Sequence, residues 1–127
     1  MKKIVIIANV DNGIGMSGGT RIYFESLKKF DSTFKSYIFS SLGTIKRIKQ
    51  EKIKNSTFFC TDTYDQMNLG SIIGLLKHSV RRLIGGLLSV KKNYWKIKKV
   101  DIVFSVSDFW PDILPALFLK WKNPKIK

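Results

Sequence analysis

The chain alternates short apolar runs with longer stretches in which apolar side chains recur every three or four residues. The short runs are typical of strands, and the β-branched run at residues 4–8 is typical of a strand buried on both faces of a parallel sheet. The periodic stretches are typical of amphipathic helices. The expected strands span residues 4–8, 35–41, 56–60 and 101–106. The expected helices span residues 20–30, 44–54, 71–92 and 111–121.

This order of elements predicts one α/β domain, 1–127, with a Rossmann-like parallel sheet and helices on both faces. Ligands of such sheets bind outside the carboxyl ends of the strands, so the loops 9–19 and 105–110 are expected to meet there. Residues 125–127 resemble the start of one more strand. The sheet is therefore expected to be incomplete within this chain.

The longest periodic stretch, 71–92, carries an apolar stripe with helical spacing. The stripe consists of Ile72, Leu76, Val80, Leu83 and Leu87. Gly85 and Gly86 lie in its middle, and each lowers helix stability by about 1 kcal/mol relative to alanine. A bend or break is therefore expected at this pair.

The balance of charged residues indicates which kind of partner the protein binds. The chain has 23 Lys and Arg residues against 9 Asp and Glu residues, a formal net charge of +14. Such a field favours anionic partners: nucleic acid, phosphorylated substrates or anionic lipid. The excess is concentrated in residues 44–99.

The cysteine content and the apolar runs of the sequence indicate in which compartment of the cell the protein is expected. Cys60 is the single cysteine, which excludes an internal disulfide and a cysteine metal cluster. The apolar run after Lys3 is short for a signal peptide, and no run approaches the ~18–20 apolar residues that a membrane span needs. We therefore expect a cytoplasmic protein, with no metal and no cofactor.

The loop between the first strand and helix contains Gly13, Gly15, Gly18 and Gly19. A glycine-rich turn before a helix can present backbone N–H groups to an anion. The letters G-x-G-x-x-G occur here, but the loop is too long for the dinucleotide-binding turn, and the phosphate loop with Gly-Lys-Ser/Thr is absent. A ligand-contacting loop and a plain flexible connection both fit this pattern.

Residues 17–21 (SGGTR) and 25–28 (ESLK) resemble the opening of family 4 glycosyltransferases, which have the two-domain GT-B fold. Residues 101–105 (DIVFS) and 111–117 (PDILPAL) resemble the strand and helix near the acceptor site of the same N-terminal domain. The resemblance implies a retaining enzyme that moves a sugar from a nucleotide-sugar to a cell-surface glycan or lipid-linked acceptor, as in polysaccharide biosynthesis. The C-terminal nucleotide-sugar domain, with its paired glutamates, is missing from this chain. We therefore expect a truncated acceptor-side domain that is inactive alone, or one completed by a separate C-terminal domain partner.

The resemblance also suggests site residues. Gly18 and Gly19 would approach the substrate, and Arg21 could assist them, although a solvated helix residue fits Arg21 as well. Many relatives carry a histidine in the loop where this chain has Asp108. Asp108 could act catalytically on an acceptor hydroxyl, or it could cap the following helix. Trp110, beside the same loop, could stack on a sugar, whereas Trp95 and Trp121 are expected mainly to pack.

The basic helix 71–92 predicts a contact with an anionic membrane at the inner face of the plasma membrane. The residues expected to make this contact are Lys77, Arg81, Arg82, Lys91 and Lys92. The alternative is that the stripe packs on the sheet and the charges are solvated. A second function class is a basic module that binds nucleic acid or another anionic ligand, although no nucleic-acid motif is present and no specific nucleic acid is expected. A third is a complete flavodoxin-like phosphate-binding domain.

Overall fold

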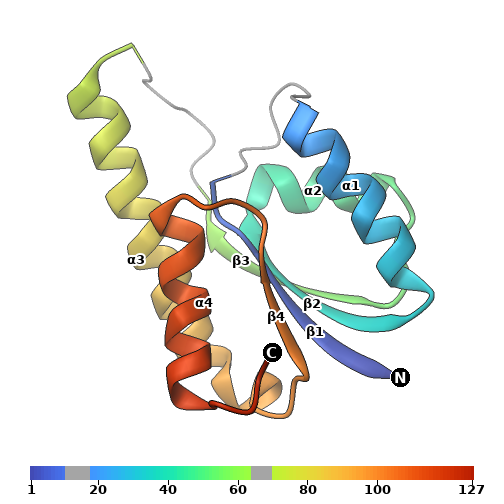
Figure 1. Ribbon diagram of the computed structural model, residues 1–127. Helices are drawn as coiled ribbons and strands as arrows, with labels where there is room; N and C mark the ends of the chain where they lie inside the picture. Colours follow the sequence, from blue (N-terminus) through green and yellow to red (C-terminus); the bar gives the residue numbers. More distant parts are fainter. Residues whose placement is uncertain (11–17, 64–69) are drawn as a thin grey trace.

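The computed structural model describes residues 1–10, 18–63 and 70–127, and within them four strands alternate with four helices (Figure 1). The strands are β1 (Lys2–Ala8), β2 (Phe34–Ser41), β3 (Ser56–Asp62) and β4 (Ile102–Ser105). The helices are α1 (Gly18–Asp31), α2 (Leu42–Gln50), α3 (Ile72–Ile97) and α4 (Trp110–Lys122). The α/β class predicted from the sequence is confirmed, and the arrangement is Rossmann-like.

The described strands form one parallel sheet in the order β3-β2-β1-β4. Ile4 of β1 pairs with Ser36 of β2 on one side and with Ile102 of β4 on the other. Because β1 has a strand on both sides and helices over both faces, residues 4–8 are almost completely buried, as their continuous apolar run predicts.

Alternate side chains of β1 point to opposite faces of the sheet and divide the core in two. Ile4 and Ile6 pack with Phe24 and Leu27 of α1. The second core lies on the side of α3 and α4 and includes Val5, Ile7, Phe39, Val90, Ile97 and Leu119. Figure 1 shows α1 and α2 on one face of the sheet and α3 and α4 on the other.

The ends of α2 differ from the expected range 44–54 for local reasons. Ser41 is both the last residue of β2 and the N-cap of α2, and its hydroxyl accepts a hydrogen bond from the backbone N–H of Thr44 at 3.4 Å. The strand therefore passes into the helix without a loop. The helix ends at Gln50, and Lys52 then adopts a positive φ of 57°, a left-handed conformation that cannot continue a helix.

The expected break at the glycine pair of α3 is wrong, because α3 runs as one helix from Ile72 to Ile97. The two glycines instead permit close packing. A Cβ atom added at Gly85 would lie less than 3.0 Å from the carbonyl oxygen of Thr61, and one added at Gly86 would lie as close to the side-chain amide of Asn9. Without side chains, these two positions let α3 lie directly against the carboxyl ends of β3 and β1.

The last residues lie along the outer side of β4. Lys127 donates its backbone N–H to the carbonyl of Asp101 at 3.0 Å, and the N–H of Val103 donates to the carbonyl of Lys127 at 2.9 Å. This is the hydrogen-bond pattern of a parallel neighbour, consistent with the expected start of another strand. Ile126 is fully buried in the core beside α4.

The packing at the glycine pair predicts that removing the Asn9 side chain reduces the destabilisation caused by Gly86→Ala but not that caused by Gly85→Ala. Gly86→Ala should lower the free energy of unfolding by about 2 kcal/mol, because the new methyl group overlaps the Asn9 side chain. In an Asn9→Ala background this loss should shrink by about 1 kcal/mol or more. Gly85→Ala, which overlaps a backbone carbonyl, should remain equally destabilising in both backgrounds. Urea denaturation of the double-mutant cycle measures these couplings, and equal losses for Gly86→Ala in both backgrounds would contradict the packing argument.

Candidate functional site

The candidate site lies at the carboxyl ends of β1 and β4, where the strand order reverses. The chain leaves β1 towards α1 on one face of the sheet and leaves β4 towards α4 on the other (Figure 1). In open parallel sheets this reversal is where ligands bind. The described residues at this edge include Asn9, Val10 and the β4–α4 connection, 106–109.

A buried carboxylate joins the segments at this edge. Asp112, in the first turn of α4, is 1% exposed. One of its oxygens accepts the backbone N–H groups of Asn9 at 2.6 Å and Val10 at 3.1 Å, and the other accepts the hydroxyl of Ser107 at 2.7 Å. The side-chain amide of Asn9 also donates to the carbonyl of Pro111 at 2.9 Å. Asp112 therefore fixes the end of β1 relative to the β4–α4 connection.

Two opposing effects set the protonation of Asp112. Burial raises the pKa of its carboxyl group from 3.8 to about 6, while the Ser107 hydroxyl and the N–H groups of Val10 and Asn9 favour the charged form. Desolvation is the larger effect, although these donors and the backbone N–H of Ser107 all lower the pKa of the carboxyl group. Close by, the side-chain oxygen of Asn9 is buried and has no hydrogen-bond partner among the described residues.

The residues predicted to bind substrate lie at the same edge of the sheet. Gly18 and Gly19 are the first residues of α1, and Arg21 is exposed in its first turn. Trp110 is half-buried at the start of α4, and Asp108 is exposed in the connection before it. The glycines at 13 and 15 fall outside the described residues.

The capping alternative for Asp108 is wrong, because the N-cap of α4 is Phe109 and no side chain caps this helix. Ser107 instead accepts the backbone N–H of Phe109 at 3.3 Å while it donates to Asp112. Sequence reasoning assigned no role to Asp112 or Asn9. The available signal was an acidic residue directly after Pro111, in a helix that follows a strand and is otherwise apolar up to Lys120.

A second buried carboxylate, Asp62, lies at the carboxyl end of β3. It pairs with Arg81 at 3.0 Å and with Arg82 at 3.3 Å. Arg82 is 1% exposed, so the expectation that it contacts a membrane is wrong. Its position on α3 turns it towards the sheet, where it meets Asp62. Arg81 keeps about half of its side chain exposed, and Lys77, Lys91 and Lys92 are exposed as expected.

The described residues hold no cluster of three or more His, Cys, Asp or Glu side chains that could bind a metal ion. The helices in the described part of the chain are too short or too polar to span a bilayer. The chemistry available at the carboxyl edge is therefore a cation at Arg21, a carboxylate at Asp108, an aromatic ring at Trp110 and the backbone held by Asp112.

The raised pKa of Asp112 predicts that the contribution of this residue to the stability of the fold decreases as the pH rises, the opposite of what an ion-paired carboxylate contributes. Between about pH 4 and pH 6 the folded protein binds a proton at Asp112 that the unfolded chain has lost, so this residue's contribution to stability falls as the pH rises, by about 3 kcal/mol in total. Asp112→Asn cannot titrate. The free energy of unfolding of the wild type, minus that of the variant, should therefore decrease between pH 4 and pH 7. Urea denaturation across this range measures the difference, and a constant or increasing value would contradict the prediction.

The ion pairs of Asp62 predict a strong dependence on its charge. Asp62→Asn should lower the free energy of unfolding by about 3 kcal/mol, because the guanidinium group of Arg82 would stay buried without this carboxylate. The exposed Asp108 provides a matched control, and Asp108→Asn should change stability by no more than about 0.5 kcal/mol. Thermal or urea unfolding compares the two variants, and equal effects would show that the buried pair contributes little.

Comparison with known proteins gives no further indication of the function of this site. The chain matches no protein-family model, no curated protein and no solved structure. A function for it has to be inferred from the fold, the carboxyl-edge site and the surface.

Proposed function

We propose that this chain is the acceptor-side domain of a retaining glycosyltransferase, which moves a sugar from a nucleotide-sugar to a cell-surface glycan or lipid-linked acceptor. The observation that carries the proposal is the hydrogen bond from the Asn9 N–H to Asp112, 103 positions away in the sequence. It joins the strand that precedes the SGGTR segment to the helix of the PDILPAL segment. Residues 18–21 of the first segment, at the start of α1, and the start of the second segment, in the first turn of α4, lie at this same edge of the sheet (Figure 1).

The side chains at this edge suit an acceptor with hydroxyl and phosphate groups. Arg21 supplies an exposed cation in the first turn of α1, where the helix dipole also favours an anion. Trp110 supplies a half-buried ring against which a sugar can stack. Asp108 supplies an exposed carboxylate that can accept a hydrogen bond from an acceptor hydroxyl. Asp112 acts as a positioning residue because its oxygens already bind the backbone and Ser107.

In this proposal the donor site belongs to a second Rossmann-like domain or chain, as the resemblance implies. The nucleotide-sugar and the catalytic glutamates lie there, so the present chain binds the acceptor and transfers no sugar by itself. The domain works at the cytoplasmic face of the plasma membrane, with Lys77, Arg81, Lys91 and Lys92 near anionic lipid. These four side chains are exposed on α3.

Two-dimensional NMR of the labelled chain tests the division between acceptor and donor. A short-chain polyprenyl-diphosphate sugar should shift the backbone signals of residues 20–22 and 105–110, whereas a panel of nucleotide-sugars should leave them unchanged and release no nucleotide. Arg21→Ala and Trp110→Ala should each weaken acceptor binding by roughly tenfold, about 1.4 kcal/mol.

Lys29→Ala serves as the control, because Lys29 is exposed on the last turn of the same helix. It should leave acceptor affinity unchanged. Turnover of a nucleotide-sugar by the isolated chain would contradict the proposal, as would acceptor-induced shifts that avoid the carboxyl edge.

A further inference from the structure

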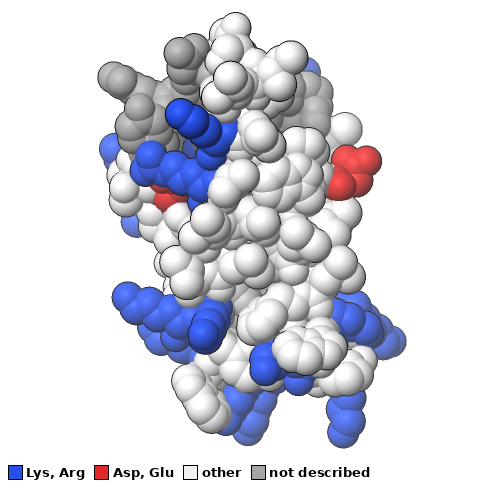
Figure 2. Space-filling view, turned by 90° about the vertical axis from the view of Figure 1, so that its left-hand side faces the viewer, with Lys and Arg blue, Asp and Glu red and all other residues white. Residues whose placement is uncertain are grey.

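Exposed apolar side chains gather on the outer face of the α3–α4 layer, away from the sheet. Ile84 and Leu88 of α3 are 51% and 61% exposed, and Leu117 of α4 is 55% exposed. The two helices pack side by side, and Figure 2 shows a broad surface without charged side chains over this part of the molecule. The alternative that the α3 stripe packs on the sheet is wrong for much of the stripe, because Ile72, Leu76 and Val80 are exposed as well.

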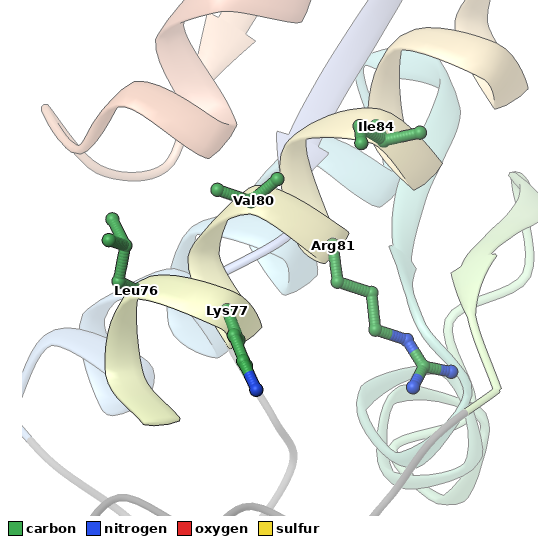
Figure 3. A pocket seen from close by; sticks show the side chains of 5 residues that line it. All are labelled: Leu76, Lys77, Val80, Arg81 and Ile84. Atoms are coloured by element: carbon green, nitrogen blue, oxygen red, sulfur yellow. The ribbon is translucent and has the colours of Figure 1, made fainter. Parts of the chain in front are cut away.

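The N-terminal half of α3 continues this surface. Leu76, Val80 and Ile84 line an open apolar hollow together with Lys77 and Arg81. Figure 3 shows that Lys77 and Arg81 extend away from Leu76 and Val80, along one flank of the same hollow. Apolar groups thus occupy one side of the helix while cations border them, the distribution typical of helices that lie in a membrane interface.

The exposed charges on the two helices of this face have one sign, and Figure 2 shows acidic groups at its upper edges alone. The sequence of α3 contains no acidic residue, and that of α4 contains Asp112, which is buried. Exposed lysines border the apolar surface near the C-terminal ends of both helices, and Figure 2 shows them on both flanks of its lower half. They include Lys91, Lys92, Lys98 and Lys122. The face is therefore complementary to an anionic surface.

Two tryptophans lie near the C-terminal ends of these helices. Trp95 is 75% exposed and Trp121 is 73% exposed, so the expectation that they mainly pack is wrong. The ammonium group of Lys98 lies 4.5 Å from the ring centroid of Trp95, and that of Lys122 lies 4.6 Å from the ring of Trp121. Large exposed indole rings beside cations are typical of side chains at the headgroup level of a bilayer.

We propose that the outer face of α3 and α4 docks on an anionic lipid bilayer. In this arrangement Leu88 and Leu117 enter the boundary of the acyl chains, Trp95 and Trp121 lie at headgroup level, and the bordering lysines bind lipid phosphates. The proposal rests on the membrane location given in the proposed function and does not depend on sugar transfer.

The aliphatic surface favours lipid over the other occupants. A nucleic acid would use the lysines and could stack on the tryptophans, but it would leave the leucines and isoleucines between them in water. A second copy of the chain would bring lysines of like charge together around the same face. An anionic bilayer accepts the apolar side chains and neutralises the cations at once.

Vesicle sedimentation and tryptophan fluorescence of the full chain test this face. The chain should bind vesicles of phosphatidylcholine with 30% phosphatidylglycerol and not vesicles of phosphatidylcholine alone, and binding should shift the tryptophan emission to shorter wavelength. Trp121→Gln should weaken the partition constant roughly tenfold. Lys92→Gln should weaken it roughly fivefold, the equivalent of about 1 kcal/mol for one cation near an anionic surface.

Matched controls lie on α1, on the other face of the sheet. Ile22 is 70% exposed there, and Lys29 is also exposed, so Ile22→Gln and Lys29→Gln should leave vesicle binding unchanged. Equal urea midpoints would show that all four variants fold alike. If Trp121→Gln does not fold, Leu117→Gln on the same face replaces it with the same expected loss.

Three results would overturn the proposal. The first is no binding to the anionic vesicles at low salt, or equal losses for the α1 controls. The second is a dimer that Trp121→Gln dissociates, which would assign the face to a second copy. The third is tighter binding to a single-stranded oligonucleotide that the same variants abolish. None of these results changes the expected NMR shifts with the acceptor, so failure of docking and failure of the transferase proposal are distinguishable.

Discussion

The contacts around Asn9 fix the geometry of the whole carboxyl edge. Its backbone N–H binds the carboxylate of Asp112, its side chain binds the carbonyl of Pro111, and α3 approaches it closely because residue 86 is glycine. One fully buried residue thus sets the positions of β1, α3 and α4 relative to one another. The loops that carry the candidate site residues begin from this joint, and their arrangement depends on it.

Asp112 holds β1 and α4 in position, but the burial of its carboxylate lowers the stability of the fold. A buried carboxylate without donors would be very unfavourable, and the hydrogen bonds to Asp112 do not fully offset its desolvation, as its pKa of about 6 indicates. Asp62, the buried carboxylate at the end of β3, is paired with two arginines. Both charges lie near the carboxyl edge, whereas the core between the layers is built from aliphatic and aromatic side chains. The free-energy cost of burying charged groups therefore arises mainly at the edge of the sheet where a ligand is expected to bind.

Local patterns in the sequence were sufficient to predict the strands, the helices and the Rossmann-like fold, because apolar runs and helical periodicity depend on neighbouring residues. Features that depend on tertiary contacts were missed. Gly85 and Gly86 signalled a weak helix, but their partners, Thr61 and Asn9, come from other elements. The burial of Arg82 depends on Asp62 in the same way. The stripe of α3 has correct periodicity, yet much of it has no partner element among the described residues. Position at the edge was predictable for Arg21, Asp108 and Trp110, whereas their chemistry remains a proposal.

Because β2 passes directly into α2, the length of the chain between these two elements cannot vary freely. Ser41 ends the strand and caps the helix in one step, so an insertion there would disturb both elements at once. Among the described residues, Asn9, Val10 and Ser107 bind Asp112 and so join the connections after β1 and β4 to the edge of the sheet. In descendants of this chain, changes of length are therefore expected away from the β2–α2 passage, for example in the β4–α4 connection outside Ser107.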